Sequence, residues 1–495
     1  MDQLIHAEAP SAHRSRCRSH IPSRVVYLMP GRLKHESHPS SFPMPPCYGG
    51  DRATGGHMGH LGHLKAEYRD LADRLNAGSV GFPEPESDAS RHGWQEILEI
   101  LYTPQEAALA ARLPVLPSSL RAIATRIGLT EDELKPRLDR MADKGIVMDL
   151  VHPKTGKTKY FLSPPVVGFF EFSMMRAQDS IPKKRMAEAL DAYTHGDPAF
   201  ANEVFGGDTV IGKTMVHENA LSDEDLPDVL DWERATSVIE EAQSFAVSYC
   251  YCRHKAEHLG KRCDAPMDVC LSVNAGAAFV VHREFGREIE RSEAMDILIQ
   301  SRESGLVQIA DNVQQKPTYI CNCCGCCCGQ LQAINEFDLP AVNPSGFEAT
   351  VNLDDCNGCS RCARACPVGA IEMRPAPVVG SRKNDLRASI DTDRCIGCGV
   401  CVQACGTRHA MTMERRPIQP TVPRTGMEKI LRMSIERGKL PDLLFDQGAG
   451  RGSRFLNQAL HGLTALGPIE RAIASEQVKS RFVRFALRNV SDPTG

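Results

Sequence analysis

Cysteines in the C-terminal half are the residues whose types and spacing most clearly indicate chemistry. Two runs share the spacing C-x2-C-x2-C-x3-C, and they consist of Cys356, Cys359, Cys362 and Cys366, and of Cys395, Cys398, Cys401 and Cys405. This spacing places three thiolates in one tight loop and a fourth in the following helix, where they can bind the corners of a [4Fe-4S] cube. A zinc ribbon needs only pairs of C-x2-C. Both runs therefore indicate [4Fe-4S] clusters.

Around these runs, at about residues 345–415, the chain resembles the bacterial two-cluster ferredoxins, in which the fourth cysteine of each run binds the other cluster. The resemblance implies two ligand sets, namely Cys356, Cys359, Cys362 and Cys405, and Cys366, Cys395, Cys398 and Cys401. Gly406 departs from the family pattern, because a proline is usual there, as at Pro367. Alternating segments predict the strands of a βαβ-type domain at 348–352, 370–373, 387–391 and 410–414.

Ten further cysteines lie upstream of these runs, at 250–328. Four of them, with gaps of one, ten and six residues, can surround one metal centre: Cys250, Cys252, Cys263 and Cys270. Zinc and a [4Fe-4S] cluster both satisfy this count, and the neighbouring runs favour iron. The other six lie within eight residues, and they are Cys321, Cys323, Cys324, Cys326, Cys327 and Cys328. Because adjacent side chains diverge, this stretch must serve more than one centre or leave some thiols free.

The Cys250-Tyr-Cys252-Arg253 segment and the 321–328 stretch together resemble segments of uncharacterised bacterial multi-cluster 4Fe-4S ferredoxin-like proteins. The resemblance extends over most of the chain from about Trp94 onward, and it implies no specific reaction. With eight ligands in the two-cluster stretch and ten further thiols, we expect three or four [4Fe-4S] clusters in the whole chain.

The elements that must position these cysteines suggest an α+β protein with five parts. We expect a poorly ordered extension at 1–93, a helical winged-helix-like domain at 94–200 and an α/β cysteine-rich domain at 201–340. A two-[4Fe-4S] ferredoxin domain follows at 341–420, and a helical basic tail at 421–495. The first 55 residues are rich in Ser, Pro, His and Arg and lack periodicity, which favours disorder. The nearby His57, His60 and His63 are interpreted as incidental.

Residues 119–162 suggest the winged-helix order of helix, helix and hairpin. Apolar residues repeat at helical spacing over 119–127, and Thr130 with Glu133 forms a capping box that opens a second helix. Segments 146–151 and 158–162 then predict the hairpin. The second helix carries four basic and five acidic side chains, so it offers phosphates no net attraction. We therefore expect this part to serve packing or partner contact and not nucleic-acid binding.

The stretch from Gly207 to Thr214 matches the phosphate-loop pattern GxxxxGK[ST]. Such a loop binds phosphate only when a buried strand precedes it and a helix follows. Residues 202–206 are short and polar, and 215–221 do not predict a strong helix. We interpret the match as a chance string, with Lys213 as an exposed charge. Further on, we expect helices at 232–242 and 292–301, and strands at 245–249, 277–282 and 306–310.

Composition gives weaker indications of partners and location. The formal net charge of −4 does not predict affinity for nucleic acid or membranes as a whole. No apolar run is long enough to span a membrane and no signal peptide is visible, so we expect a cytoplasmic protein. The stretch from Lys479 to Arg488 places Phe482 and Phe485 among arginines. It could contact a membrane surface or an acidic partner, or pack on the protein itself.

These observations predict an electron-transfer protein that relays single electrons between redox partners such as a flavoprotein or a reductase. No dinucleotide-binding turn, activated nucleophile or HExxH motif indicates a site of substrate turnover. Whether the chain is an enzyme stays open. One alternative is an iron–sulfur redox sensor that regulates transcription through the winged helix. Others are the electron-transfer subunit of a larger oxidoreductase, and an oxidoreductase that itself works at an open-coordination cluster in the six-cysteine stretch.

Overall fold

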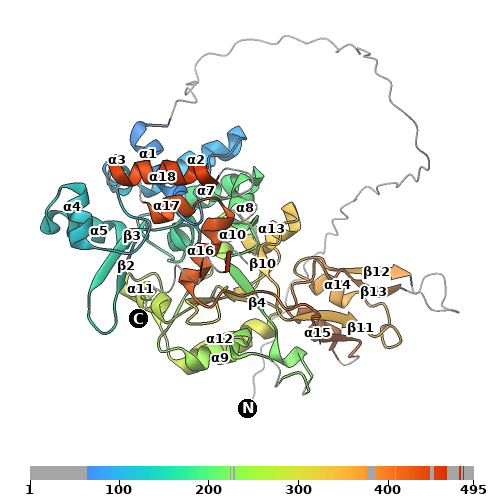
Figure 1. The fold of residues 1–495 in the computed structure, drawn as a ribbon. Coiled ribbons are helices and arrows are strands. Elements are labelled where there is room, and N and C mark those ends of the chain that lie inside the picture. The colour runs from blue at the N-terminus through green and yellow to red at the C-terminus, as the bar shows by residue number, and fades with distance from the viewer. Residues whose placement is uncertain are drawn as a thin grey trace, which may run out of the picture. The chain divides into compact units, whose positions relative to one another are not determined.

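The computed structural model describes residues 64–222, 224–226, 229–375, 386–406, 409–445, 451–464, 479–480 and 483 (Figure 1). Three of our expectations concern segments outside these residues: the disorder of residues 1–63, the three histidines at 57–63, and most of the basic stretch beyond Lys479. From Leu64 onward the described residues form one compact unit in which helices surround several sheets. The expected mixture of α and β structure is therefore confirmed.

Residues 64–93, which we expected to be poorly ordered, instead join a helical core. The helical core begins with α1 (Ala66–Asn76), α2 (Asp88–Leu101) and α3 (Pro104–Ala110), of which α1 and the start of α2 lie in residues 64–93. Leu71 of α1 is fully buried, and Phe82 in the connection stacks on Trp94 with ring centroids 5.8 Å apart. The expectation failed because a few large apolar side chains at helical spacing suffice to dock a helix, even where the flanking sequence is polar.

The next elements follow in the order expected for residues 119–162. They are β1 (Ser118–Ser119), α4 (Leu120–Ile127), α5 (Glu131–Asp143), β2 (Val147–Val151) and β3 (Thr158–Leu162). The three strands form a sheet in the order β1-β3-β2. The capping box at the start of α5 is present, with the side chain of Thr130 accepting from the Glu133 amide. The winged-helix assignment itself stays a prediction.

The acidic face of α5 contacts another part of the same chain. Arg283 donates hydrogen bonds to Asp139 at 3.1 Å, to Asp143 at 2.7 Å and to Asp149 of β2 at 2.5 Å. The side chains of Arg283 and Asp149 are 9% and 2% exposed, so this pair is largely removed from solvent, whereas Asp143 stays mostly exposed. Part of α5 is therefore used for packing within the molecule.

Four further elements lead from β3 to the large sheet. They are η1 (Pro165–Phe169), α6 (Phe170–Met174), α7 (Lys183–His195) and α8 (Pro198–Phe205). Aromatic side chains join them to the N-terminal helices, because Phe170 and Tyr193 both contact the ring of Phe82. These contacts pack α6 and α7 on the N-terminal part, while Val166 of η1 and Glu171 of α6 line a cavity with the upstream cysteines.

A seven-stranded sheet carries the upstream cysteines. Its strands are, in spatial order, β10 (Val342–Asn343), β4 (Gly212–Met215), β8 (Val307–Asp311), β9 (Tyr319–Cys323), β6 (Asp268–Val273), β5 (Phe245–Tyr249) and β7 (Arg287–Glu288). The β10–β4 pair is parallel, and the other neighbours are antiparallel. The strands expected at 245–249 and 306–310 are present, whereas β6 and β9 were not anticipated.

Helices cover both faces of this sheet. They are α9 (Ala235–Glu241), α10 (Tyr251–His258), α11 (Ala275–His282), α12 (Arg291–Glu303) and α13 (Gly329–Phe337), with short turns η2 (Glu218–Ala220) and η4 (Asp231–Glu233). Val238 of α9 and Leu298 of α12 pack with Val247 on one face, while Ala246 contacts α11 on the other. The strand expected at 277–282 is wrong, because this short apolar run is helix α11 and periodicity cannot separate the two.

The phosphate-loop match falls in a strand of the sheet. Gly212, Lys213 and Thr214 belong to β4, so their backbone groups pair with β8 and are not free to surround a phosphate. The expectation that Lys213 is exposed is wrong, because only 2% of this residue is accessible. Its Nζ donates to the carbonyl oxygens of Trp232 at 2.7 Å and Val313 at 2.6 Å. Lys213 therefore ties two connecting segments to the sheet.

The expected strands of the C-terminal cysteine region are present as two two-stranded sheets, one of which, β12 with β13, is visible in Figure 1. The elements are β11 (Phe347–Val351), α14 (Arg361–Ala365), β12 (Ile371–Pro375), β13 (Leu386–Ile390), α15 (Val400–Cys405) and β14 (Met411–Arg415). β11 pairs with β14 and β12 with β13, in both cases antiparallel. Residues 376–385, between β12 and β13, lie outside the described part of the chain.

Helices follow this region, as expected for the tail. They are α16 (Gly426–Glu436), α17 (Leu440–Leu444) and α18 (Arg451–Thr464). Lys479 is 2% exposed and pairs with Glu436 at 2.8 Å, and Val483 is buried with Leu431 of α16. These two residues pack on the protein itself. Among the described helices, none combines the length and the apolar character needed to cross a membrane.

Candidate metal centres

Two small cavities in the C-terminal cysteine region are each lined by four thiols from both runs. We call Cys356, Cys359, Cys362 and Cys405 the outer quartet, and Cys366, Cys395, Cys398 and Cys401 the inner quartet. Each cavity combines three cysteines of one run with the fourth cysteine of the other. This is the grouping that the ferredoxin resemblance implied.

Local backbone geometry brings these thiols together. Gly397 has φ of 70°, and a Cβ atom there would lie 2.1 Å from the carbonyl oxygen of Phe347. Only glycine permits this conformation and this approach. The Ser345 hydroxyl donates to the Gly397 carbonyl at 2.6 Å and holds the loop against β11. Short helices α14 and α15 then carry the last ligands of each run.

The two quartets differ in exposure. Cys359 is exposed, whereas Cys398 and Cys401 are buried and Cys398 belongs to the large core shared with the N-terminal helices. Burial raises the pKa of Cys398 to about 12, while hydrogen bonding to the Arg361 amide lowers the pKa of Cys359. The outer quartet therefore contains a thiol that is more exposed than any thiol of the inner quartet.

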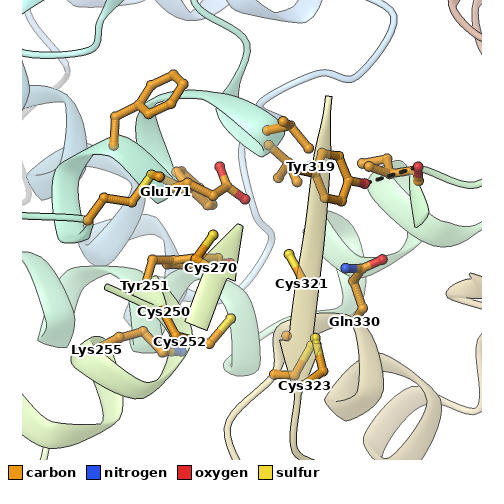
Figure 2. Close-up of a pocket in the computed structure, with 18 of the residues that line it drawn as sticks. Glu171, Cys250, Tyr251, Cys252, Lys255, Cys270, Tyr319, Cys321, Cys323 and Gln330 are labelled. Carbon is orange, nitrogen blue, oxygen red and sulfur yellow. Dashed lines mark hydrogen bonds between the residues drawn. The ribbon is translucent and has the colours of Figure 1, made fainter. Parts of the chain in front are cut away.

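The upstream cysteines surround a larger cavity of about 250 Å³. Eight of them line it, including Cys324 and Cys327. We call the other six the cavity cysteines: Cys250, Cys252, Cys270, Cys321, Cys323 and Cys328. Their thiols contact one another in sequence around the cavity, from Cys270 through Cys321 and Cys323 to Cys328, and on through Cys252 to Cys250. Figure 2 shows several of these sulfur atoms facing the same space.

Strand alternation explains why these cysteines share one face. Side chains two residues apart on a strand point to the same side, so Cys321 and Cys323 of β9 face the cavity together. β6 pairs with β9 through Leu271 and Ile320, which places Cys270 opposite Cys321. Cys250 follows directly after β5, the other neighbour of β6. The sheet therefore contributes four of the six thiols.

Two helix N-termini supply the other side of the cavity. Cys252 lies in the first turn of α10, and Cys328 immediately precedes α13. Hydrogen bonds with the thiols of Cys252 and Cys323 lower the pKa of Cys328 to about 5. Unpaired amides and the helix dipole at an N-terminus favour negative charge. This environment fits thiolate ligands.

Glu171 of α6 also lines the cavity, and the sequence analysis did not identify it. Figure 2 shows its carboxyl group pointing toward the side where Cys270 and Cys321 lie. The Gly168 amide donates to Glu171 Oε2 at 2.9 Å. Burial raises the pKa of Glu171 to about 8. The available signal was a single acidic residue inside the apolar run 165–175.

The backbone beside Glu171 is strained. Val167 has φ of 40°, a conformation that β-branched residues rarely adopt. Val167 and its neighbour Gly168 form the turn that holds the Glu171 carboxyl group over the cavity. Strain of this kind persists where the surrounding structure requires it, and it is frequent at functional sites.

The remaining four upstream cysteines form a second cluster, two members of which, Cys324 and Cys327, also line the cavity. We call Cys263, Cys324, Cys326 and Cys327 the loop quartet, and their Sγ atoms all lie within 4.8 Å of one another. The sequence suggested one centre formed by Cys250, Cys252, Cys263 and Cys270. The structure instead groups Cys263 with the three cysteines of the 321–328 stretch. Cys263 precedes β6 and the other three follow β9, so the antiparallel pairing of these strands brings both loops to the same end of the sheet.

Arg253 lies between the loop quartet and the cavity cysteines. It is fully buried, its Nη1 donates to Cys324 Sγ at 3.7 Å and its Nη2 donates to the Asn322 carbonyl oxygen at 2.8 Å. A buried guanidinium next to thiols offsets the negative charge of thiolates. The sequence analysis noted Arg253 beside Cys252 without assigning it this role.

The six-cysteine stretch packs directly on the inner quartet. A Cβ atom at Gly325 would lie 2.4 Å from the carbonyl oxygen of Pro367, the residue after Cys366. Asn335 of α13 donates to the same carbonyl at 3.0 Å. Arg394, which precedes Cys395, donates to the Ile334 carbonyl at 3.1 Å. The two cysteine-rich parts of the chain therefore share an extended contact.

Comparison with known proteins identifies one of these parts. Residues 355–408 match the family model of the 4Fe-4S dicluster domain, which covers both C-terminal cysteine runs. The chain therefore contains a ferredoxin-like domain that binds 4Fe-4S clusters. A search of curated proteins finds no match to the chain.

Proposed function

We propose that this protein is an iron–sulfur electron-transfer protein that relays single electrons between redox partners. The outer and inner quartets would each hold a [4Fe-4S] cluster, and the cavity cysteines would hold a further iron–sulfur centre. When bound, such clusters supply reversible one-electron storage. The observation that carries the proposal is the contact of the six-cysteine stretch with Pro367, because it places the cavity cysteines next to the inner quartet.

The chain's own residues support a directional arrangement. Exposed Cys359 makes the outer quartet accessible from solvent, whereas no cysteine of the inner quartet is fully exposed and Cys398 and Cys401 are buried. The cavity cysteines lie on the far side of the contact made by Gly325, Asn335 and Arg394. We expect a flavoprotein or reductase to dock near Cys359.

An anaerobic reductive titration followed by electron paramagnetic resonance tests the proposal. The wild-type protein should show signals from the two ferredoxin-type clusters and from a third centre. Replacing Cys270 and Cys321 together by Ser should remove the third signal and leave the other two. Failure of the wild-type protein to undergo reversible one-electron reduction would overturn the proposal.

Glu171 favours a second candidate function, an oxidoreductase that reduces a small apolar substrate at the cavity. With its pKa raised to about 8 by burial, its carboxyl group is protonated at neutral pH and can donate a proton. The rest of the cavity lining is largely apolar, with Tyr251 and Phe170 among its residues.

The pH dependence of the reduction potential distinguishes this candidate from simple electron transfer. If reduction at the cavity is coupled to protonation of Glu171, the potential should change by about 59 mV per pH unit above the carboxyl pKa. Glu171→Gln should abolish this dependence without changing the iron content. A potential that is independent of pH in the wild type would exclude the second candidate.

A further inference from the structure

We propose that the loop quartet, Cys263, Cys324, Cys326 and Cys327, binds a single zinc ion in tetrahedral geometry. Its four ligands are distinct from the cavity cysteines and from the outer and inner quartets, and two of them, Cys324 and Cys327, lie at the edge shared with the cavity. The inference does not depend on the proposed function. Its metal would have a structural role, because zinc undergoes no redox chemistry.

The spacing of the sulfur atoms carries this inference. Cys263 Sγ lies 3.6 Å from Cys324 Sγ and 3.9 Å from Cys327 Sγ, and the Cys326 and Cys327 sulfur atoms are 3.6 Å apart. Zinc–sulfur bonds of about 2.3 Å in a tetrahedron require sulfur atoms about 3.8 Å apart. The loop quartet therefore already has the dimensions of a mononuclear thiolate site.

A [4Fe-4S] cube requires a wider arrangement. Each thiolate of a cube binds a different iron, so its four sulfur atoms lie further apart than four sulfur atoms around one ion. Within the described part of the chain, no other three Cys, His, Asp or Glu side chains bring their ligand atoms within 4.8 Å of one another. The sulfur atoms of the outer and inner quartets, which match the dicluster family, are thus not packed as closely as those of the loop quartet, as expected for cubes.

The surroundings favour zinc over iron. Four thiolates around a divalent ion carry a net negative charge, and the buried Arg253 guanidinium lies 3.7 Å from Cys324 Sγ to offset part of it. Sites of the same ligands generally bind Zn²⁺ more tightly than Fe²⁺.

The position of the site explains what a structural metal would do. Cys263 lies before β6 and the other ligands follow β9, so the ion would join two loops at one end of the sheet. Cavity cysteines Cys323 and Cys328 flank the ligands directly, and Gly325 between them contacts Pro367. A bound zinc would therefore fix both the cavity thiols and the contact with the inner quartet.

Elemental analysis of the full-length protein, purified without oxygen, tests the site. We expect one zinc per chain in the wild type. Cys326→Ser should lose the zinc and keep the iron, and the fold should survive because Cys326 is exposed. Cys263→Ser provides a second, independent removal of a ligand. Asp264→Asn, at the exposed residue beside Cys263, should keep both metals and serves as the matched control.

Cobalt substitution gives a readout of the geometry. Protein produced with Co²⁺ in place of zinc should show the ligand-field absorption bands of a tetrahedral cobalt–thiolate centre, and Cys326→Ser should lose them. Loss of iron instead of zinc in Cys326→Ser, or mononuclear iron in the wild type, would overturn the assignment. Absence of both zinc and tetrahedral cobalt bands would overturn it as well.

Discussion

At the scale of single residues, buried ionisable side chains support sites that are not evident from the sequence. Arg253, Glu171 and Lys213 are all placed where an unpaired charge is costly, and each has a defined set of neighbours. Arg253 contacts a thiol, Glu171 faces thiols across a cavity, and Lys213 holds two backbone carbonyls. These contacts lead to two predictions.

Arg253→Met should weaken metal binding at the loop quartet. The change removes the positive charge beside Cys324 and the donor to the Asn322 carbonyl. Loss of a group that supports metal ligands typically lowers metal affinity by about 10- to 100-fold. Competition with a zinc chelator measures the effect.

The control for this change is Arg262→Met, because Arg262 lies near the same loop but pairs with Glu257 on the surface. It should leave zinc affinity unchanged. Equal affinity in wild type and Arg253→Met would show that Arg253 does not support the site.

Lys213 should make stability depend on pH. Burial lowers its pKa to about 8, against about 10.4 in the unfolded chain. The unfolded state therefore binds more protons between these values, and the folded state gains stability as pH rises through them. Relative to Lys213→Met, the free energy of unfolding of the wild type should rise by roughly 1 kcal/mol from about pH 7 to about pH 9.

Unfolding at the two pH values, followed anaerobically in both proteins, measures this difference. Lys65→Met, which removes an exposed lysine before α1, is the matched control and should show no such dependence. A difference between wild type and Lys213→Met that is independent of pH would mean that Lys213 keeps its charge with an ordinary pKa.

At the scale of elements, each thiol group is assembled from segments that are distant in the sequence. The outer and inner quartets each combine two runs, and the loop quartet combines the loops before β6 and after β9. The cavity cysteines combine β6, β9 and the end of β5 with two helix N-termini. The function of each cysteine therefore depends on an element distant in sequence.

Exchange of the fourth ligands between the two runs can be tested by matching variants. Cys405→Ser should remove the same paramagnetic signal as Cys359→Ser, because both residues line the outer cavity. Cys366→Ser should remove the same signal as Cys398→Ser, because both line the inner cavity. If Cys405→Ser instead removed the same signal as Cys398→Ser, and Cys366→Ser the same signal as Cys359→Ser, each run would bind its own cluster.

The contact between the six-cysteine stretch and the inner quartet should be sensitive to one methyl group. Gly325→Ala places a Cβ atom 2.4 Å from the Pro367 carbonyl oxygen, so one of the segments must move. Overpacking of this kind costs about 1–3 kcal/mol. We expect a lower melting temperature and slower reduction of the cavity centre through the ferredoxin-like domain.

Gly426→Ala is the matched control for this prediction, because a Cβ atom at Gly426, the first residue of α16, meets no neighbouring atom. It should leave both properties unchanged. Normal reduction kinetics in Gly325→Ala would indicate that electrons do not cross this contact.

At the scale of the whole molecule, the cysteine-rich parts share one core. The same cluster of buried side chains contains Leu71 of α1, Cys323 of β9 and Cys398 of the inner quartet. The parts that we expected as separate domains are therefore packed together from Leu64 onward. Such packing keeps metal centres at fixed separations.

The metal content of the whole protein should follow from the four thiol groups. Two cubes and one further four-iron centre give about 12 irons per chain, since each [4Fe-4S] cluster holds four. Elemental analysis of the anaerobic protein measures this number. A value near eight would mean that the cavity cysteines bind no iron, and a value near 16 would place a cube at the loop quartet.

The sequence by itself was sufficient to identify the ferredoxin-like domain, because its ligands repeat at short fixed offsets and its strands alternate locally. Only the tertiary structure decided how the ten cysteines at 250–328 divide, since their grouping depends on the pairing of β6 with β9 and on which face each side chain occupies. It also decided the roles of Glu171 and Lys213, whose burial arises from segments far away in the chain. The spacing of neighbouring ligands can be read directly from the sequence. Strand register and burial are set only when distant segments pack together.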